Sequence, residues 1–279
     1  MSPVNLALSQ YKLNHKRDVA GPLPEYEWPS FEAHTNPVLK VSRASAGDHI
    51  IPGLPPLLDQ LNLGSCAANA GAGALEILLN NEGALRQLSR LHLYWIARAV
   101  DGTTTEDAGT YLSSIVQQMH KIGVCDESVW TYEPDALVTH AGNRVKKFIC
   151  PPPVESDIRA SENRVSGYYR INTTGAQRLA DITTAIRANH PVIFGTEVGD
   201  GFIKTKGITP VLPDPKDMQG GHATCLVGVQ TIAGRQSFMD KNSWGPGWAA
   251  GGYCWLDQDY MTWGETSDIW VITRMSPLL

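Results

Sequence analysis

The sequence has no long hydrophobic run and no block of like charge. No stretch approaches 18 consecutive apolar residues, and the first 18 residues have neither a basic nor an apolar segment. The sequence therefore predicts no membrane span and no secretory signal, which makes a cytoplasmic protein the default expectation, with signal-less export left open. Basic residues occur at most in pairs such as Lys146-Lys147, and 23 basic against 28 acidic residues give a net charge of −5. We expect no nucleic-acid partner.

Cysteine is also sparse, with five residues at positions 66, 125, 150, 225 and 254. No two of them form a C-x-x-C pair, and no histidine stands near them at the spacing of metal ligands, so we expect no metal site. The count is odd, which leaves at least one free thiol in a monomer. The low density is typical of a protein in a reducing compartment, but it does not exclude one or two disulfide bonds in an exported protein.

The 279 residues are enough for two subdomains that share a cleft. Residues 1–47 are rich in proline and lack periodicity, which indicates an extended segment that docks on a surface. Residues 48–155 carry apolar stripes of helical spacing at 64–80, 87–100 and 109–123. Residues 156–279 contain one more such stripe, on Leu179, Ile182 and Ile186, and then mostly strand-like runs.

Those runs are PVIFGTEV (191–198), ATCLVGVQ (223–230), QSFMDK (236–241), GYCWL (252–256) and IWVITR (269–274). A helical first half and a chiefly β second half predict an α+β fold in two segregated parts. If the halves face each other, a cleft between them would join residues far apart in the sequence.

One cysteine stands where a nucleophile would be useful. Cys66 lies at the predicted start of a helix, where free N–H groups and the helix dipole favour a thiolate. The candidate base is His222, which follows two glycines at the start of an apolar strand, and the candidate residue that orients it is Asn242. Taken alone, each of the three is more typical of a structural residue, so the hypothesis depends on their combination.

The order Cys, His, Asn within DQLNLGSC, GGHA and KNSWGPGW resembles the papain-like cysteine proteases over about residues 50–275, and is most similar to their bacterial branch. The resemblance implies a papain-like fold with a helical part, a β-barrel-like part and a cleft between them. It implies a peptide or protein substrate, a catalytic thiolate and no cofactor. The molecule is then expected to be a monomer.

Carried over to this sequence, the resemblance makes Cys66 the nucleophile, His222 the base, Asn242 the residue that orients the imidazole, and Gln60 the oxyanion-hole side chain. Trp244 matches the indole that shields the histidine–asparagine hydrogen bond. Among substrate-binding positions, it implies Gly109, Gly221, Trp244 and Trp248. The implied reaction passes through an acyl-enzyme thioester on the cysteine.

The sequence departs from the family pattern at three positions. Leu63 replaces a cysteine that forms a disulfide in secreted relatives, and Ala67 replaces an aromatic residue. Leu61 stands where glycine usually follows the glutamine, so the oxyanion loop is expected to differ. The region Trp263–Glu265 is a further candidate for substrate contacts.

Residues 1–47 have two interpretations. They complete the β part as a structural wrap, or they form a short inhibitory prosegment that covers Cys66 and makes the chain a zymogen. For the whole chain, two other functions stay open: a catalytically silent protein-binding module, and a thiol amidase or acyltransferase with the same residues.

Overall fold

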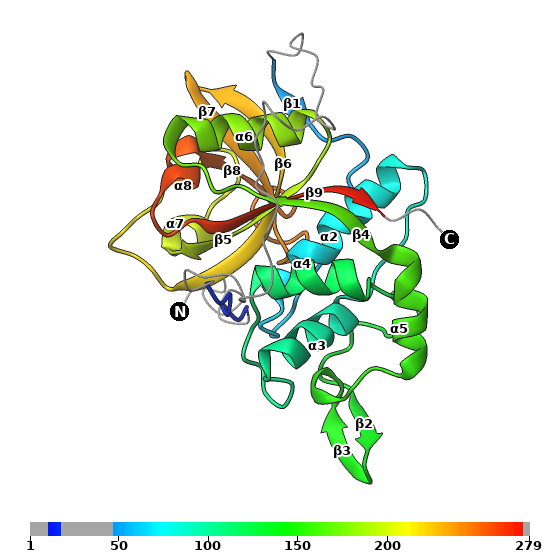
Figure 1. Ribbon diagram of the computed structural model, residues 1–279. Coiled ribbons are helices and arrows are strands. Elements are labelled where there is room, and N and C mark those ends of the chain that lie inside the picture. Colours follow the sequence, from blue (N-terminus) through cyan, green and yellow to red (C-terminus); the bar gives the residue numbers. More distant parts are fainter. Residues whose placement is uncertain (1–10, 18–46, 276–279) are drawn as a thin grey trace.

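A computed structural model describes residues 11–17 and 47–275, and Figure 1 shows an antiparallel sheet with helices of the first half of the chain at its lower right and helices of the second half at its upper left. The first helices, α2 (Cys66–Asn81), α3 (Arg90–Asp101) and α4 (Leu112–Lys121), come from the three stripes that predicted helices. The predicted α+β class is confirmed. The boundary near residue 155 between two subdomains stays a prediction.

The main sheet has seven strands, all paired antiparallel. Its order is β4-β9-β5-β6-β7-β8, with β1 added beside β6, so that β4 and β8 are edges and the described strands form no closed barrel. The strands are β1 (His49–Ile50), β4 (Val165–Arg170), β5 (Val192–Val198), β6 (Gly220–Ile232), β7 (Arg235–Lys241), β8 (Tyr253–Asp257) and β9 (Ser267–Met275). The five predicted runs became β5 to β9.

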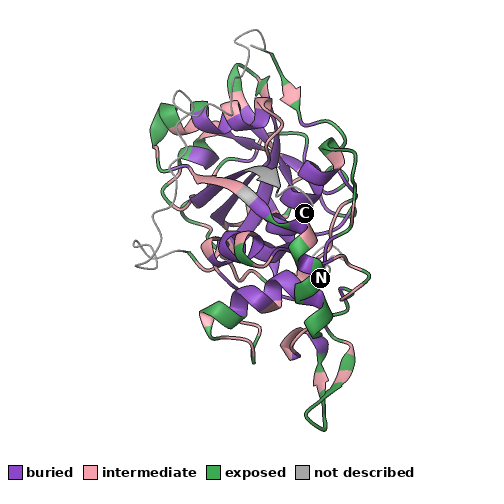
Figure 2. Cartoon of the chain, turned by 45° about the vertical axis from the view of Figure 1, so that its right-hand side comes forward, coloured by how far each residue is buried: buried purple, intermediate pink, exposed green. Residues whose placement is uncertain are grey.

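Small residues let α2 sit in the middle of the molecule. A Cβ built at Gly71 would lie 2.5 Å from the Ile115 side chain of α4, so only glycine permits this approach. On its other sides α2 packs against α3, β5, β6 and β9. Figure 2 shows the buried residues concentrated in this helix and in the strands beside it. The packing fixes the start of α2 against the sheet.

Several elements lie outside the sequence prediction. They are the exposed hairpin β2 (Leu137–His140) and β3 (Asn143–Lys146), the edge strand β4, and the short helices α5 (Val154–Ala160), α7 (Asp200–Ile203) and α8 (Gln258–Thr262). Two 3₁₀ turns, η1 (Lys147–Ile149) and η2 (Ser161–Asn163), flank α5, and the predicted fourth helix is α6 (Gly175–Arg187). Within the described ranges, no helix is both long and apolar enough to cross a membrane.

All five cysteines lie in the described part of the chain, buried and free of disulfide bonds. Cys225 and Cys254 belong to β6 and β8, where burial raises the pKa of both thiols. Position 63, where the family resemblance implies a disulfide cysteine, is a buried leucine.

Candidate active site

Cys66 is the first residue of α2 and is completely buried. The loop before it is held in place by a side-chain contact, because the Ser65 hydroxyl lies 2.6 Å from the Tyr132 hydroxyl. The Asn69 side chain, one turn into the helix, donates to the Ser65 carbonyl at 3.0 Å. These contacts fix the thiol at a helix N-terminus, where backbone N–H groups have no partner within the helix.

His222 and Asn242 meet across two neighbouring strands. His222 lies in β6, and Asn242 follows the last residue of β7, which pairs with β6. The imidazole Nε2 and the Asn242 Oδ1 are 2.8 Å apart. Trp244 covers this pair, with its ring centre 4.8 Å from that of His222. The covered hydrogen bond fixes the orientation of the imidazole.

The imidazole Nδ1 faces away from Asn242 and finds no hydrogen-bond partner among the described residues. Ala223, the residue after His222, has its backbone N–H within hydrogen-bond reach of the Cys66 thiol. The start of α2 therefore lies directly against the start of β6. This brings the predicted nucleophile and base into the same site although 155 residues separate them in the chain.

Burial keeps both groups neutral in this arrangement. It raises the pKa of the Cys66 thiol to about 11, although backbone N–H groups of Ala223, Asn14 and Ala67 act in the opposite direction. It lowers the pKa of the His222 imidazole to about 4, although the hydrogen bond that the imidazole donates to Asn242 acts in the opposite direction. Removing the solvent disfavours each charged form. Burial in the covered site therefore favours the neutral thiol and the neutral imidazole.

The Gln60 side chain is held in one orientation beside these groups. Its Oε1 accepts a hydrogen bond from the Ser243 hydroxyl at 2.8 Å, which turns the amide nitrogen toward the cleft. The Nε2 donates to the Leu63 carbonyl at 3.1 Å and to the Lys12 carbonyl at 3.2 Å. A fixed amide donor that already binds a peptide carbonyl has the property that an oxyanion hole requires.

Leu61, where a glycine was noted as usual, adopts a φ of 53°. This left-handed conformation is uncommon for residues other than glycine, asparagine and aspartate. The Asp59 carboxylate offsets part of the strain by accepting the Leu61 N–H at 2.8 Å. The loop that carries Gln60 is therefore strained at Leu61.

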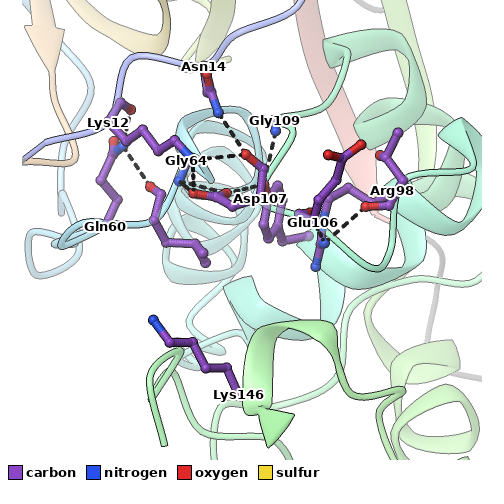
Figure 3. A network of polar contacts seen from close by, with 12 residues as sticks. Lys12, Asn14, Gln60, Gly64, Arg98, Glu106, Asp107, Gly109 and Lys146 are labelled. Atoms are coloured by element: carbon purple, nitrogen blue, oxygen red, sulfur yellow. Dashed lines mark hydrogen bonds and ion pairs between the residues drawn. The ribbon is translucent and has the colours of Figure 1, made fainter.

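Asp107 joins the Cys66 loop to the facing wall of the cleft (Figure 3). Its carboxylate accepts the Gly64 N–H at 3.0 Å and the Tyr94 hydroxyl at 2.6 Å. The same hydroxyl accepts the Gly109 N–H at 3.1 Å. Asp107 thus holds the positions of both Gly64 and Gly109, and of these three residues only Gly109 was a predicted site residue.

Residues 11–17, which we call the strap, run through this cleft. The Tyr11 ring stacks on Trp244 at 5.2 Å and its hydroxyl donates to the Trp244 carbonyl. Further along, the His15 N–H donates to the Gly221 carbonyl at 3.0 Å. Lys16 then forms a strand-like bridge with Tyr111. The strap therefore passes from the tryptophan side of the site to the wall that carries Gly109.

The strap also contacts the central residues of the site. The Asn14 backbone N–H lies within hydrogen-bond reach of the Cys66 thiol. A Cβ at Gly109, where φ is 72°, would lie 1.8 Å from the Asn14 carbonyl oxygen, and one at Gly221 would lie 2.6 Å from that of His15. Both glycines line the cleft and leave room for a peptide backbone.

The eighth predicted site residue, Trp248, joins this region through contacts with Trp244 and with α7. Its ring packs at 5.1 Å from Phe202 of α7, and its Nε1 donates to the Ile203 carbonyl. Phe202 also packs against His222. Sequence reasoning missed Phe202, because one phenylalanine in a glycine-rich stretch carries no signal, and it missed Ser243 although that residue lies within the quoted KNSW motif.

Comparisons with known proteins identify the family of the chain. The model of the family described as papain family cysteine protease matches residues 49–270. An uncharacterised peptidase C1-like protein of Acanthamoeba polyphaga mimivirus is 33% identical over 233 residues, which cover 78% of this chain and 70% of the viral protein.

Two solved structures share the fold. The structure of xylellain, a cysteine protease from Xylella fastidiosa, matches with a TM-score of 0.77 at 22% identity, covering 96% of this chain and 98% of xylellain. That of a procathepsin B from Trypanosoma congolense matches with a TM-score of 0.68 at 15% identity, covering 99% and 89%. These relatives come from a virus, a bacterium and a eukaryote, so the expected bacterial origin stays a prediction. Together with the family match, they show that the chain belongs to the papain family of cysteine proteases.

Proposed function

We propose that the chain hydrolyses peptide bonds through Cys66, His222 and Asn242, with Gln60 and the Cys66 backbone N–H as oxyanion donors. The observation that carries this proposal is the 2.8 Å hydrogen bond between His222 Nε2 and Asn242 Oδ1, which leaves Nδ1 directed elsewhere. An imidazole fixed at one nitrogen can exchange a proton at the other. We propose that the group with which Nδ1 exchanges a proton is the adjacent Cys66 thiol.

In the proposed reaction, His222 takes the Cys66 proton and the thiolate attacks the peptide carbonyl carbon. The carbonyl oxygen gains negative charge and is held by Gln60 Nε2 and the Cys66 N–H. The C–N bond then breaks as the imidazolium gives its proton to the leaving amine, which leaves a thioester on Cys66. Water, deprotonated by His222, attacks the thioester and releases the carboxylic acid and the free thiol.

We also propose that the strap holds this enzyme inactive. The supporting contacts are the Lys12 carbonyl on Gln60 Nε2 and the Asn14 N–H at the Cys66 thiol. A substrate would need both of those positions. The strap itself resists cleavage because the group offered to the sulfur is an N–H, whereas a nucleophile needs a carbonyl carbon.

Removing the strap should also change the charge state of the site. The neutral thiol and imidazole follow from burial, to which the strap contributes. With water admitted, the pKa of the thiol falls and that of the imidazole rises, so the thiolate–imidazolium pair becomes accessible. The strap is thus expected to inhibit in two ways: it blocks the access of substrate, and it keeps the Cys66 thiol protonated.

The test is to mix the full chain and its Lys12→Ala/Arg17→Ala variant with unlabelled peptides and to identify products by mass spectrometry. We expect slow cleavage by the full chain, faster cleavage by the variant, and none when Cys66→Ser is added to either. An added amine that appears in the products would identify an acyltransferase instead. Binding of peptides without any cleavage, in a variant whose Cys66 is alkylated readily, would leave the silent binding module as the correct reading.

A further inference from the structure

An arginine outside the predicted constellation connects the two segments that carry the proposed oxyanion donors. Arg90 is the first residue of α3 and is half-buried. Its Nη1 donates to the Asp59 carbonyl at 3.0 Å and to the Asn69 Oδ1 at 3.1 Å. Its guanidinium stacks on the Tyr132 ring, with the guanidinium carbon 3.9 Å from the ring centre. Both hydrogen atoms of one nitrogen are therefore used, and the stack fixes the plane of the group.

Tyr132 connects the same two segments at a second point. Its hydroxyl donates to the Gln60 carbonyl at 2.9 Å and lies 2.6 Å from the Ser65 hydroxyl. The Glu127 carboxylate accepts the Tyr132 N–H, and its charge attracts Arg90. Ser65 directly precedes Cys66 in the chain. Tyr132 therefore couples the residue that carries one donor to the neighbour of the residue that carries the other.

The direction of these hydrogen bonds is set at Arg90. A guanidinium can only donate, so the Asn69 atom that faces it is the amide oxygen. The Asn69 amide nitrogen then points at Ser65, where it lies 3.0 Å from both the carbonyl and the hydroxyl oxygen. The Ser65 hydroxyl in turn donates to the Tyr132 hydroxyl, whose own proton goes to the Gln60 carbonyl. These contacts close a ring, which we call the clamp, made by Asp59, Gln60, Tyr132, Ser65, Asn69 and Arg90.

We propose that Arg90 is a positioning residue that fixes the spacing of the two oxyanion donors, Gln60 Nε2 and the Cys66 N–H. This inference rests on the proposed peptidase function and adds to it a residue that touches neither the substrate nor the reacting atoms. Oxyanion donors must already be in place when charge develops on the substrate. A misplacement of about 1 Å can cost about 100-fold in rate.

The loop between the two donors needs such a clamp because it is strained. Leu61 directly follows Gln60 and has a left-handed φ of 53°. A strained backbone persists only where the surrounding contacts over-determine it. The Ser243 hydroxyl orients the amide of Gln60, whereas the clamp ties the Gln60 backbone to the residue before Cys66. Without Arg90, the loop is expected to relax and to move Gln60 away from the Cys66 N–H.

The first test separates the oxyanion hole from the thiol in the chain that carries Lys12→Ala/Arg17→Ala. Adding Arg90→Met keeps a long side chain without a donor, and we expect it to lower kcat for peptide cleavage about tenfold while KM changes less than about twofold. Alkylation of Cys66 by iodoacetamide forms no oxyanion, so its rate should change less than about twofold. A loss of kcat and of the alkylation rate by the same factor, or of neither, would overturn the inference.

Three further variants keep this test decisive. Arg90→Lys restores a cationic donor without the stack and should lower kcat only about threefold. Tyr132→Phe keeps the ring that Arg90 stacks on and removes only the hydroxyl; it should lower kcat about tenfold, and less than additively with Arg90→Met. If Arg90→Met fails to fold in thermal unfolding, Tyr132→Phe carries the test. The matched control is Arg86→Met, whose ion pairs go to Asp126 and Glu162, and it should change neither rate.

The second test needs no turnover. The Cys66 sulfur adds to the carbon of a peptide aldehyde while the thiol proton moves to the former carbonyl oxygen, which then occupies the oxyanion hole. The measurement is how strongly acetyl-Leu-Leu-argininal, and the alcohol of the same sequence, each protect Cys66 from iodoacetamide. The advantage of the aldehyde over the alcohol should fall about tenfold with Arg90→Met.

The outcomes of the second test separate the two proposals. An equal advantage of the aldehyde with and without Arg90→Met, or no advantage in either chain, would overturn the role of Arg90. If the advantage falls as expected but neither chain cleaves peptides, the proposed peptidase function fails and the positioning role of Arg90 stands.

Discussion

Replacing Gly195 by alanine should open the site without touching any residue of the proposed chemistry. The added Cβ would lie 1.9 Å from the His15 Nε2, whereas ordinary van der Waals contact begins near 3.4 Å. The ring must therefore retreat by about 1.5 Å from Gly195. Gly195 is not in a left-handed conformation, so alanine adds no backbone strain of its own.

The size of the effect follows from the cost of overpacking. One extra methyl group in a well-packed site costs about 1–3 kcal/mol. Here it destabilises only the state in which the strap occupies the cleft. That range corresponds to an increase of about 5- to 150-fold in the population of chains whose strap has left the cleft. Moving His15 also takes its Nε2 away from the Asp268 carboxylate, which lies 3.7 Å from it, so the upper half of the range is expected.

The assay is the second-order rate of Cys66 alkylation, measured by intact-protein mass spectrometry with peptide mapping. A matched control is Gly201→Ala in α7, where an added Cβ meets no atom within 4 Å and where φ is not positive. The control should leave the rate unchanged. If Gly195→Ala also leaves it unchanged while thermal unfolding shows a folded protein, the strap does not limit access to Cys66.

Three further predictions concern the site itself. In the full chain, the Cys66 pKa of about 11 keeps the thiol protonated at neutral pH, so its alkylation rate should rise about tenfold per pH unit between pH 7 and 10; a plateau near pH 7 would contradict the neutral resting state. Asn242→Ala removes the 2.8 Å hydrogen bond to His222 and should lower kcat about 100-fold in a strap-weakened chain, with KM changed far less, as steady-state kinetics would show. Leu61→Gly relieves a left-handed φ of 53° and should raise the free energy of unfolding by up to about 1 kcal/mol in urea titration, and a loss of stability would show that the leucine side chain outweighs the strain.

The catalytic constellation was predictable because its residues occur in motifs whose chemistry is specific. A cysteine at a helix start, a histidine at a strand start and an asparagine before a tryptophan each carry a weak signal. Their combination with Gln60, six residues before the cysteine, is strong, and the structure brings all of them together. The central helices and strands were predictable for a different reason, since their hydrophobic periodicity is strong.

The rest could not be predicted from local sequence. Asp268 approaches His15 from β9, and its position depends on strand pairing between residues far apart in the chain. Phe202 lies in a four-residue helix that has no periodicity to detect. The strap was expected as part of residues 1–47, and its described portion, residues 11–17, lies on the cleft, but its contacts depend on the shape of the surface that it covers.

The most direct test of the account is where and how fast an epoxide probe reacts in the full chain and in its Lys12→Ala/Arg17→Ala variant at mildly acidic pH. We predict one modified residue, Cys66, slow in the full chain, faster in the variant, and lost when His222→Ala is added. Equal labelling of the two chains would contradict inhibition by the strap. Slow labelling spread over all five cysteines would contradict the catalytic role of Cys66 itself.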